Sequence, residues 1–296
     1  MELLLLVVLI IVGAILTKQG WLTQRAIFWA NKWIIVVAAP AIALIKIPLI
    51  ELSGTILAPV IAPIVVFFGS FFLFYVVFKS VFNKEEKLVL TLLSGLGNTS
   101  FLGFPLVSAY YGGSYLPYAV VFDQLTFLLL ATVAQWLIVS TKGSFSIKNS
   151  LIKIITFPPF IALIVAVVLP NGAIDGNLLL VLEKLGSTLS PVAMLIVGYQ
   201  VARFVDFKFS KPIFYGLGYK LFIAPMLIVG VLYFLKIEEP IFKASVMEAA
   251  MAPMVTIAIL VSDYKILPKL TAQVLTWGIL ASFPTTFLWY LILERF

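Results

Sequence analysis

This chain consists mainly of apolar blocks, each about 20 residues long, separated by short polar stretches. Of its 296 residues, 62% are hydrophobic and 11% are charged, and the mean hydropathy is +1.15. A soluble domain of this length needs far more charge on its surface. A bilayer, in contrast, is crossed by roughly 20 residues of apolar helix. The sequence therefore predicts an all-α integral membrane protein.

Ten apolar segments are long enough to span a bilayer when helix tilt is allowed for. We expect the first to be a retained span, because Met1-Glu2 lacks the positive charge of a signal peptide and no small-residue cleavage site follows. Ten spans place both termini on the same side. The predicted spans are residues 2–18, 23–47, 55–80, 87–111, 116–139, 149–170, 177–203, 211–235, 240–263 and 268–293.

The distribution of Lys and Arg predicts the orientation of these spans. Fourteen of the cations fall in one set of alternate loops and helix ends, whereas five fall in the opposite set, which includes the termini. Because Lys and Arg concentrate on the cytoplasmic side, we expect both termini outside the cytoplasm of a multi-pass cell-membrane protein. This bias also accounts for the net charge of +7, so the charge gives no reason to expect a nucleic-acid partner.

The chain contains no cysteine and no histidine. This composition excludes disulfides, thiol nucleophiles, His acid–base pairs and His/Cys metal sites. An intramembrane aspartyl protease would need two facing aspartates with their own local signature, which the surroundings of Asp123 and Asp263 do not provide. We therefore expect no enzyme activity, no metal site and no cofactor.

The two halves of the chain share short motifs in the same order, at offsets between 150 and 162 residues. Each half contains five predicted spans, and an odd number means that the second half enters the membrane from the opposite face. Inverted repeats of this kind are typical of secondary transporters. The predicted organisation is a first repeat at 1–139, a linker at 140–148 and a second repeat at 149–296. The matching motifs are PAIALIKI (40–47) with PVAMLIVG (191–198), IAPIVVF (61–67) with IAPMLIV (223–229), Tyr111 with Tyr264, and LTFLLLA (125–131) with LTWGILA (275–281).

The stretch SGLGNTSFLGFPLV (94–107) interrupts the fourth predicted span with helix breakers and hydrogen-bonding residues. The repeat places Pro253 at the matching point of the ninth span. Irregular backbone survives in a membrane only where it faces protein or a wet cavity. Small residues also serve close helix packing, which is the alternative role for Gly103.

Two interrupted helices that cross near the midplane would direct two half-helix N-termini at one point. Such ends offer unpaired N–H groups and partial positive charge, which suit an anion. We therefore expect a carboxylate site at the two breaks, with bound solute or ion supplying part of the hydrogen bonding. The predicted binding residues are Gly97, Asn98, Thr99, Ser100, Gln124, Tyr199, Met251, Ala252 and Pro253.

Three ionisable residues lie inside predicted spans, where charge is costly and usually functional. Glu248 precedes the second break by about one turn and is a candidate proton carrier, or else a structural carboxylate tied to Lys220. Asp123 could face the breaks, or could be an ordinary acidic residue near a helix start. Lys220 could pair with either carboxylate or attract an anionic substrate.

Four motifs together resemble the auxin efflux carrier family, which includes plant auxin exporters and bacterial permeases for malate- or malonate-like acids. The resemblance implies ten helices in two inverted five-helix repeats, with crossed, broken helices 4 and 9. It also implies a scaffold of helices 1, 2, 6 and 7, a transport domain of helices 3–5 and 8–10, and a homodimer. The motifs are GNTSFLGFPLV (97–107), YAVVFDQL (118–125), LSPVAMLIVGYQ (189–200) and MEAAMAP (247–253).

This sequence departs from the plant exporters in two respects. Their breaks carry an asparagine–proline pair, whereas here Asn98 has no adjacent proline and Met251 occupies the equivalent position in the second break. Their long central cytoplasmic loop is short here. These differences argue against auxin itself as the native substrate.

The sequence as a whole predicts a secondary active transporter that moves a small organic anion, auxin-like or a dicarboxylate, by alternating access. Coupling to protons, coupling to sodium and plain uniport all remain open. One alternative is a cation-coupled carrier resembling bile-acid symporters or sodium–proton antiporters on the same architecture. Another is a membrane receptor or assembly factor without transport.

Overall fold

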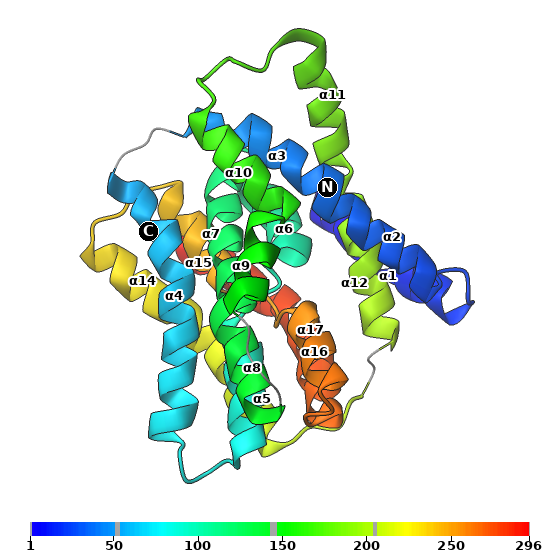
Figure 1. The fold of residues 1–296 in the computed structure, drawn as a ribbon, viewed down its shortest axis with the longest axis vertical. Helices are drawn as coiled ribbons and strands as arrows, with labels where there is room; N and C mark the ends of the chain where they lie inside the picture. The colour runs from blue at the N-terminus through cyan, green and yellow to red at the C-terminus, as the bar shows by residue number, and fades with distance from the viewer. Residues whose placement is uncertain (1, 51–53, 143–146, 204–205, 296) are drawn as a thin grey trace.

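The fold is described from a computed structural model that covers residues 2–50, 54–142, 147–203 and 206–295. All regular secondary structure in these ranges is helical (Figure 1). The all-α class predicted from the sequence is confirmed for these residues. Residues 143–146 of the predicted linker lie outside the described residues.

The first half of the chain forms eight α-helices, several of them continued by π- or 3-10-helical turns. They are α1 (Glu2–Lys18), α2 (Gln24–Trp33), α3 (Ala39–Lys46), α4 (Leu57–Phe72), α5 (Lys84–Gly95), α6 (Phe104–Tyr111), α7 (Leu116–Leu129) and α8 (Gln135–Lys142). The turns are η1 (Ile34–Ala38), η2 (Ile47–Leu49), η3 (Gly54–Ile56), η4 (Leu73–Val77), η5 (Thr99–Gly103) and η6 (Leu130–Ala134).

The second half forms nine further α-helices and one π-helical turn, η7 (Tyr219–Ile223). The α-helices are α9 (Ile147–Ile155), α10 (Pro158–Val168), α11 (Gly176–Ser187), α12 (Leu189–Arg203), α13 (Lys211–Gly218), α14 (Ala224–Phe234), α15 (Ile241–Ala249), α16 (Val255–Asp263) and α17 (Pro268–Leu293).

Six continuous helical segments in the described residues are long and apolar enough to cross a membrane. They are Gln24–Leu49, Gly54–Val77, Leu116–Thr141, Gly176–Arg203, Lys211–Phe234 and Pro268–Leu293. The other four predicted spans are either shorter than these six or interrupted. Leu3–Lys18 and Pro158–Val168 are shorter apolar helices, and the spans at 87–111 and 240–263 are interrupted. The ten-span inverted repeat stays a prediction.

The helices pack in two groups. In one group, α1 packs along α12, and α3 packs against α10 and α11. In the other, α4 packs against α5, α7 and α14, while α15 packs against α7 and α14. Figure 1 shows α1 and α12 alongside each other at one side of the molecule and α4 with α14 at the other. Contacts of α12 with η5 and of α3 with α7 connect the groups.

The contact between α1 and α12 depends on two glycines. A Cβ atom on Gly13 would lie 3.0 Å from the Cα of Leu195, and one on Gly198 would lie 2.8 Å from the backbone nitrogen of Ala14. The two backbones therefore approach too closely for any side chain at either position. Small residues allow this close packing between helices in membranes.

Replacing Gly198 with Leu should separate α1 from α12 and lower the melting temperature of the purified protein. Overpacking of this kind costs about 1–3 kcal/mol. Gly230→Leu is the matched control, because a Cβ at Gly230 meets no atom within 4 Å. Equal melting temperatures for the two variants would show that the glycine contact does not hold these helices together.

Candidate functional site

The first helix interruption lies between α5 and η5. A capping box starts α5: the Oδ1 of Asn83 accepts from the Glu86 N–H, and the Glu86 carboxylate accepts from the Asn83 N–H, both at 2.9 Å. The helix ends at Gly95, and Leu96 is extended, with φ −119° and ψ 120°. Helical structure resumes with η5 and continues into α6. The break thus occupies the glycine-rich stretch.

The second interruption separates α15 from α16 and covers residues 250–254, which include Pro253. A cluster at the other end of α15 holds this short helix in place. The Lys243 ammonium lies 2.5 Å from a carboxylate oxygen of Glu239 and 2.9 Å from one of Glu294, and the Tyr115 hydroxyl donates to Glu239 at 2.8 Å. The cluster joins α15 to the start of α7 and the end of α17.

The hydrogen bonds from Lys243 and Tyr115 lower the pKa of the Glu239 carboxyl. Partial burial, together with the bond to Glu239, raises the pKa of the Tyr115 hydroxyl to about 12. At neutral pH, Glu239 is therefore charged while Tyr115 remains a hydrogen-bond donor. The anchor of α15 is intact under these conditions.

The two interruptions pair with each other through the backbone. Gly97 and Pro253 form an antiparallel bridge. The Asn98 N–H donates to the Ala252 carbonyl at 2.8 Å, and the Met254 N–H donates to the Leu96 carbonyl at 3.0 Å. We call residues 96–98 and 252–254 the paired breaks. Backbone groups inside a membrane must be satisfied within the protein, and here each break supplies partners for the other.

A cavity of about 240 Å³ opens beside the paired breaks. The first residues after both breaks line it, so the N-terminal ends of η5 and α16 face one space. The lining residues are Asn31, Ile34, Ile35, Ala39, Asn98, Thr99, Ser100, Phe101, Asp123, Phe127, Leu130, Phe157, Pro159, Gln200, Met254, Val255 and Thr256. We call this the central cavity.

Asp123 connects α7 to the first break. Its side chain is buried, and its Oδ1 accepts hydrogen bonds from the hydroxyls of Thr99 and Ser100, both at 2.5 Å. The Gln124 amide donates to the other carboxylate oxygen at 3.4 Å. Asp123 therefore faces the central cavity and also holds the first turn of η5.

Two amide side chains that line the central cavity have unused hydrogen-bonding capacity. Within the described residues, the buried Nδ2 of Asn98 and the buried Oε1 of Gln200 have no hydrogen-bond partner. Buried polar groups are almost always paired, so such atoms mark a place for a ligand or for water. Asn98, at the first break, therefore has an unsatisfied donor beside the cavity, and Gln200 on α12 has an unsatisfied acceptor.

The structure does not bring all the predicted residues to the cavity. Asn98, Thr99, Ser100 and Asp123 line it. Gln124 lies outside the lining and donates a hydrogen bond to Asp123. On α12 the lining residue is Gln200, and Tyr199 is only half-buried against the core. Gly97, Met251, Ala252 and Pro253 form the paired breaks and the adjoining turn, outside the lining. Asn31 of α2 lines the cavity and was not predicted.

Glu248 and Lys220 lie away from the cavity lining, beside the paired breaks. Glu248 is fully buried, and neither carboxylate oxygen has a hydrogen-bond partner among the described residues. Its carboxylate lies against Gly103, where a Cβ would lie 2.7 Å from its carboxyl carbon. Lys220 is also buried and donates to the Ala249 carbonyl, at the end of α15, at 3.0 Å.

Gly97 and Gly103 therefore leave space for neighbouring side chains. A Cβ on Gly97 would lie 2.9 Å from the Lys220 ammonium nitrogen, and a Cβ on Gly103 would overlap the Glu248 carboxylate. The absence of side chains at these two positions leaves room for two ionisable groups at the breaks. Helix packing alone does not explain these glycines.

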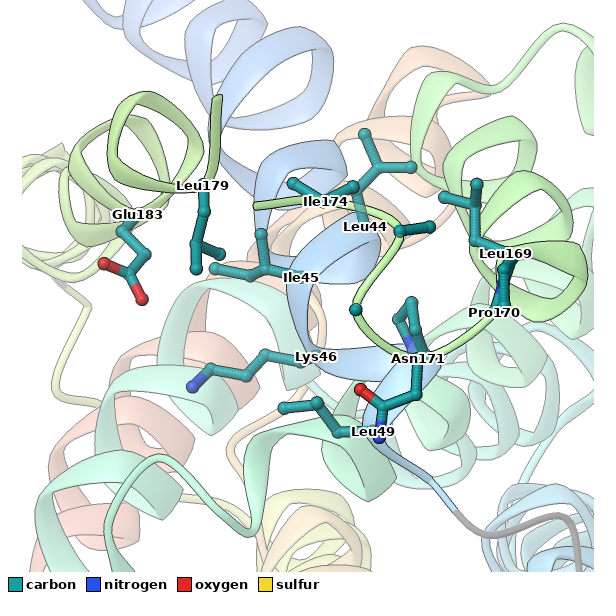
Figure 2. Close-up of a pocket in the computed structure, with 13 residues that line it drawn as sticks. Leu44, Ile45, Lys46, Leu49, Leu169, Pro170, Asn171, Ile174, Leu179 and Glu183 are labelled. Atoms are coloured by element: carbon teal, nitrogen blue, oxygen red, sulfur yellow. The ribbon is translucent and has the colours of Figure 1, made fainter. Parts of the chain in front are cut away.

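A second pocket, also about 240 Å³, lies where α3 and η2 approach the segment between α10 and α11 (Figure 2). Figure 2 shows Lys46, Asn171 and Glu183 around this pocket, with Leu44, Ile45 and Leu49 beside them. None of the predicted site residues lines it. The central cavity is therefore the stronger candidate for the functional site.

Comparison with known proteins identifies the protein family of this chain. A family model described as membrane transport protein matches residues 1–290. The chain belongs to the membrane transport protein family. This match confirms the resemblance to the auxin efflux carriers seen in the motifs. It also supports a multi-pass transporter of the membrane.

Two archaeal proteins of this kind are similar along much of their length. An uncharacterised transporter from Methanothermobacter thermautotrophicus is 25% identical over 297 residues, covering 97% of this chain and 95% of the relative. An uncharacterised transporter from Methanocaldococcus jannaschii is 29% identical over 210 residues, covering 67% of this chain and 68% of the relative.

Because the Glu248 carboxylate occupies the space beside Gly103, this transporter should be destabilised by Gly103→Ala. The expected cost is about 1–3 kcal/mol, as for other overpacked positions. The cost should be smaller when Glu248 is also replaced by Ala, because the obstructing carboxylate is then absent. Melting temperatures of the wild type, both single variants and the double variant give this coupling.

Gly230→Ala serves as the control substitution, because a Cβ there meets open space. Additive effects of Gly103→Ala and Glu248→Ala would show that the two residues do not share this space.

Proposed function

We propose that this protein is a secondary active transporter that carries a small organic anion, a dicarboxylate or auxin-like acid, through the central cavity. The observation that carries the proposal is that two helix starts, after the paired breaks, face one cavity that also contains the free Asn98 amide donor. The membership of a membrane transport family supports the transport activity itself.

The substrate carboxylate would bind at the two helix starts. The first N–H groups of a helix have no partner within it and carry partial positive charge. Thr99, Ser100 and Phe101 provide such groups from one break, and Val255 and Thr256 provide them from the other. The Asn98 amide adds a side-chain donor. Phe127, Phe157, Leu130 and Ile34 would contact the apolar part of the substrate.

Asp123 is the first candidate for the residue that couples anion transport to a proton or sodium ion. An anion in the small central cavity lies near the Asp123 carboxylate, and two negative charges repel strongly in a buried site. A proton or sodium ion that neutralises Asp123 would therefore bind together with the anion, and each would favour the other. Glu248, buried beside the breaks without a hydrogen bond, is a second candidate, with Lys220 as its positive neighbour.

For the architecture, we propose ten spans in two inverted repeats, with a scaffold of spans 1, 2, 6 and 7 and a mobile domain of spans 3–5 and 8–10. Six long helices, two shorter apolar helices and two interrupted ones are consistent with ten spans. The two helix groups support the division, since α1–α3 pack with α10–α12. A homodimer is part of this proposal by analogy with the family.

One observation favours a cation-coupled carrier as a second candidate. The described residues that line the central cavity include Asp123 but no Lys or Arg. A carboxylate with neighbouring hydroxyl and amide oxygens is suited to a hard cation such as sodium. Under this alternative, sodium alone would stabilise the protein without any organic acid.

Replacing Asn98 with Ala should weaken binding of the transported acid by roughly 10–100-fold, because a hydrogen bond to a charged group contributes about 1.5–3 kcal/mol. The measurement is ligand-induced thermal shift over a set of small carboxylates, followed by uptake of the best ligand into proteoliposomes. Asn171→Ala, which removes an exposed amide outside the central cavity, is the control.

Asp123→Asn separates the two candidate functions in the same assay. Under anion transport coupled through Asp123, this variant should still bind the acid but lose the dependence of uptake on a proton or sodium gradient. Under the cation-carrier alternative, it should lose stabilisation by sodium. Unchanged binding, uptake and gradient dependence in both Asn98→Ala and Asp123→Asn would contradict the assigned site.

The proposed orientation is testable because the chain has no cysteine. A single cysteine at Ser80, between α4 and α5, should react with a membrane-impermeant maleimide only after the membrane is opened. A cysteine at Asn171, between α10 and α11, should react in intact cells. The reverse labelling pattern would invert the predicted topology.

A further inference from the structure

An apolar groove of about 600 Å³ lies outside the central cavity, among η4, the α13–η7 segment and α17. It shares no residue with the central cavity. We call it the lateral groove. Its lining residues are Leu73, Phe78, Phe209, Phe214, Tyr215, Leu217, Gly218, Tyr219, Leu221, Phe222, Ile223, Trp277, Ala281, Pro284 and Thr285.

The lateral groove opens toward the hydrocarbon of the bilayer. Phe214, Phe222 and Ile223 line it and are largely exposed on the protein surface. They lie on Lys211–Phe234, one of the segments able to span a membrane. Water is absent at that depth, so the natural occupant of an exposed apolar groove is a lipid chain.

Aromatic residues frame one end of the groove. Phe207 and Phe209 pack edge-on against Trp277, with ring centroids 6.0 and 5.5 Å away. Phe78 packs edge-on against Tyr215 at 4.7 Å. Of these residues, Trp277 and Tyr215 belong to the types that favour the boundary between hydrocarbon and headgroups. This end of the groove therefore corresponds to the membrane interface.

Trp277 lines the groove with the apolar part of its ring. Its indole Nε1 is buried and has no hydrogen-bond acceptor among the described residues. The groove therefore offers almost entirely apolar surface to an occupant.

Three lysines lie at or next to this end, together with the carboxylate of Asp206, which accepts from the Lys208 N–H and the Gln273 amide. The Lys211 ammonium lies 5.9 Å from the centre of the Tyr215 ring, which lines the groove. Lys208 and Lys79 are the chain neighbours of the lining residues Phe209 and Phe78. Basic groups at the membrane interface attract anionic headgroups.

We infer that the lateral groove is a binding site for an anionic glycerolipid. One hydrocarbon chain occupies the apolar part, beside the ring of Trp277, and the phosphate lies near Lys211 and Lys208. The inference rests on a surface separate from the central cavity. It therefore holds or fails independently of the proposed transport activity.

The proposed site for the lipid hydrocarbon chain is tested with two glycines on the same helical segment. A Cβ at Gly218 or at Gly230 meets no atom within 4 Å, but only Gly218 lines the groove. Gly218→Leu should fill the groove and weaken binding of phosphatidylglycerol, measured by native mass spectrometry of the purified full-length protein, at least fivefold. Gly230→Leu should bind as the wild type does. Equal binding by the two variants overturns the inference.

The role of the lysines is tested in the same way. Lys208→Ala with Lys211→Ala should reduce the preference for phosphatidylglycerol over phosphatidylcholine at least fivefold, whereas Lys184→Ala, an exposed lysine away from the groove, should leave it unchanged. Glycerol phosphate without chains should not compete. A preference that survives loss of both lysines, or competition by glycerol phosphate, contradicts the assignment.

Discussion

The requirement that backbone N–H and C=O groups be satisfied away from water governs this structure. Ordinary helices meet it internally, but two helices here stop inside the protein. The bonds from Asn98 to Ala252 and from Met254 to Leu96 supply what each interruption lacks. Because the two breaks complete each other, irregular backbone can exist at this depth without a bound solute. The breaks are therefore a stable part of the fold, and both helix starts remain available to the cavity.

Two of the ionisable groups around the breaks lie at helix ends. Asp123 binds the hydroxyls of Thr99 and Ser100 on the cavity side, while Lys220 binds the last turn of α15. A cation near a helix C-terminus and a carboxylate near a helix N-terminus are each favourable with the helix dipole. Glu248 is the exception, because its buried carboxylate has no hydrogen-bond partner in the part of the chain that the structure describes. A carboxylate held in this way is costly.

Much of this arrangement could be predicted from the sequence, because it follows from residue type. The glycines at 95 and 97, followed by Asn98, and the proline at 253 weaken a helix locally. An aspartate in an apolar run must find donors. Helix rotation is harder to predict. Tyr199 and Gln200 are neighbours, and only the packing of α12 determines that Gln200 faces the cavity. Asn31 was missed for the same reason.

Two further features could not be predicted because they depend on contacts between distant segments. Lys220 was expected to pair with a carboxylate or to attract substrate; it interacts electrostatically with Glu248, and its hydrogen bond goes to the carbonyl of Ala249. The place of Gly103 against the Glu248 carboxylate likewise depends on how η5 meets α15. Hydrophobic periodicity carries no information on such pairings.

The pairing of the breaks also has a consequence for biosynthesis. Pro253 is made 156 residues after its partner Gly97. At ordinary translation speed, this delay lasts roughly 8–30 seconds. Throughout that interval, the nascent first half must keep the amide of Asn98 and the carbonyl of Leu96 hydrated or shielded by the insertion machinery. Release of this segment into lipid should therefore be delayed until the ninth segment has left the ribosome.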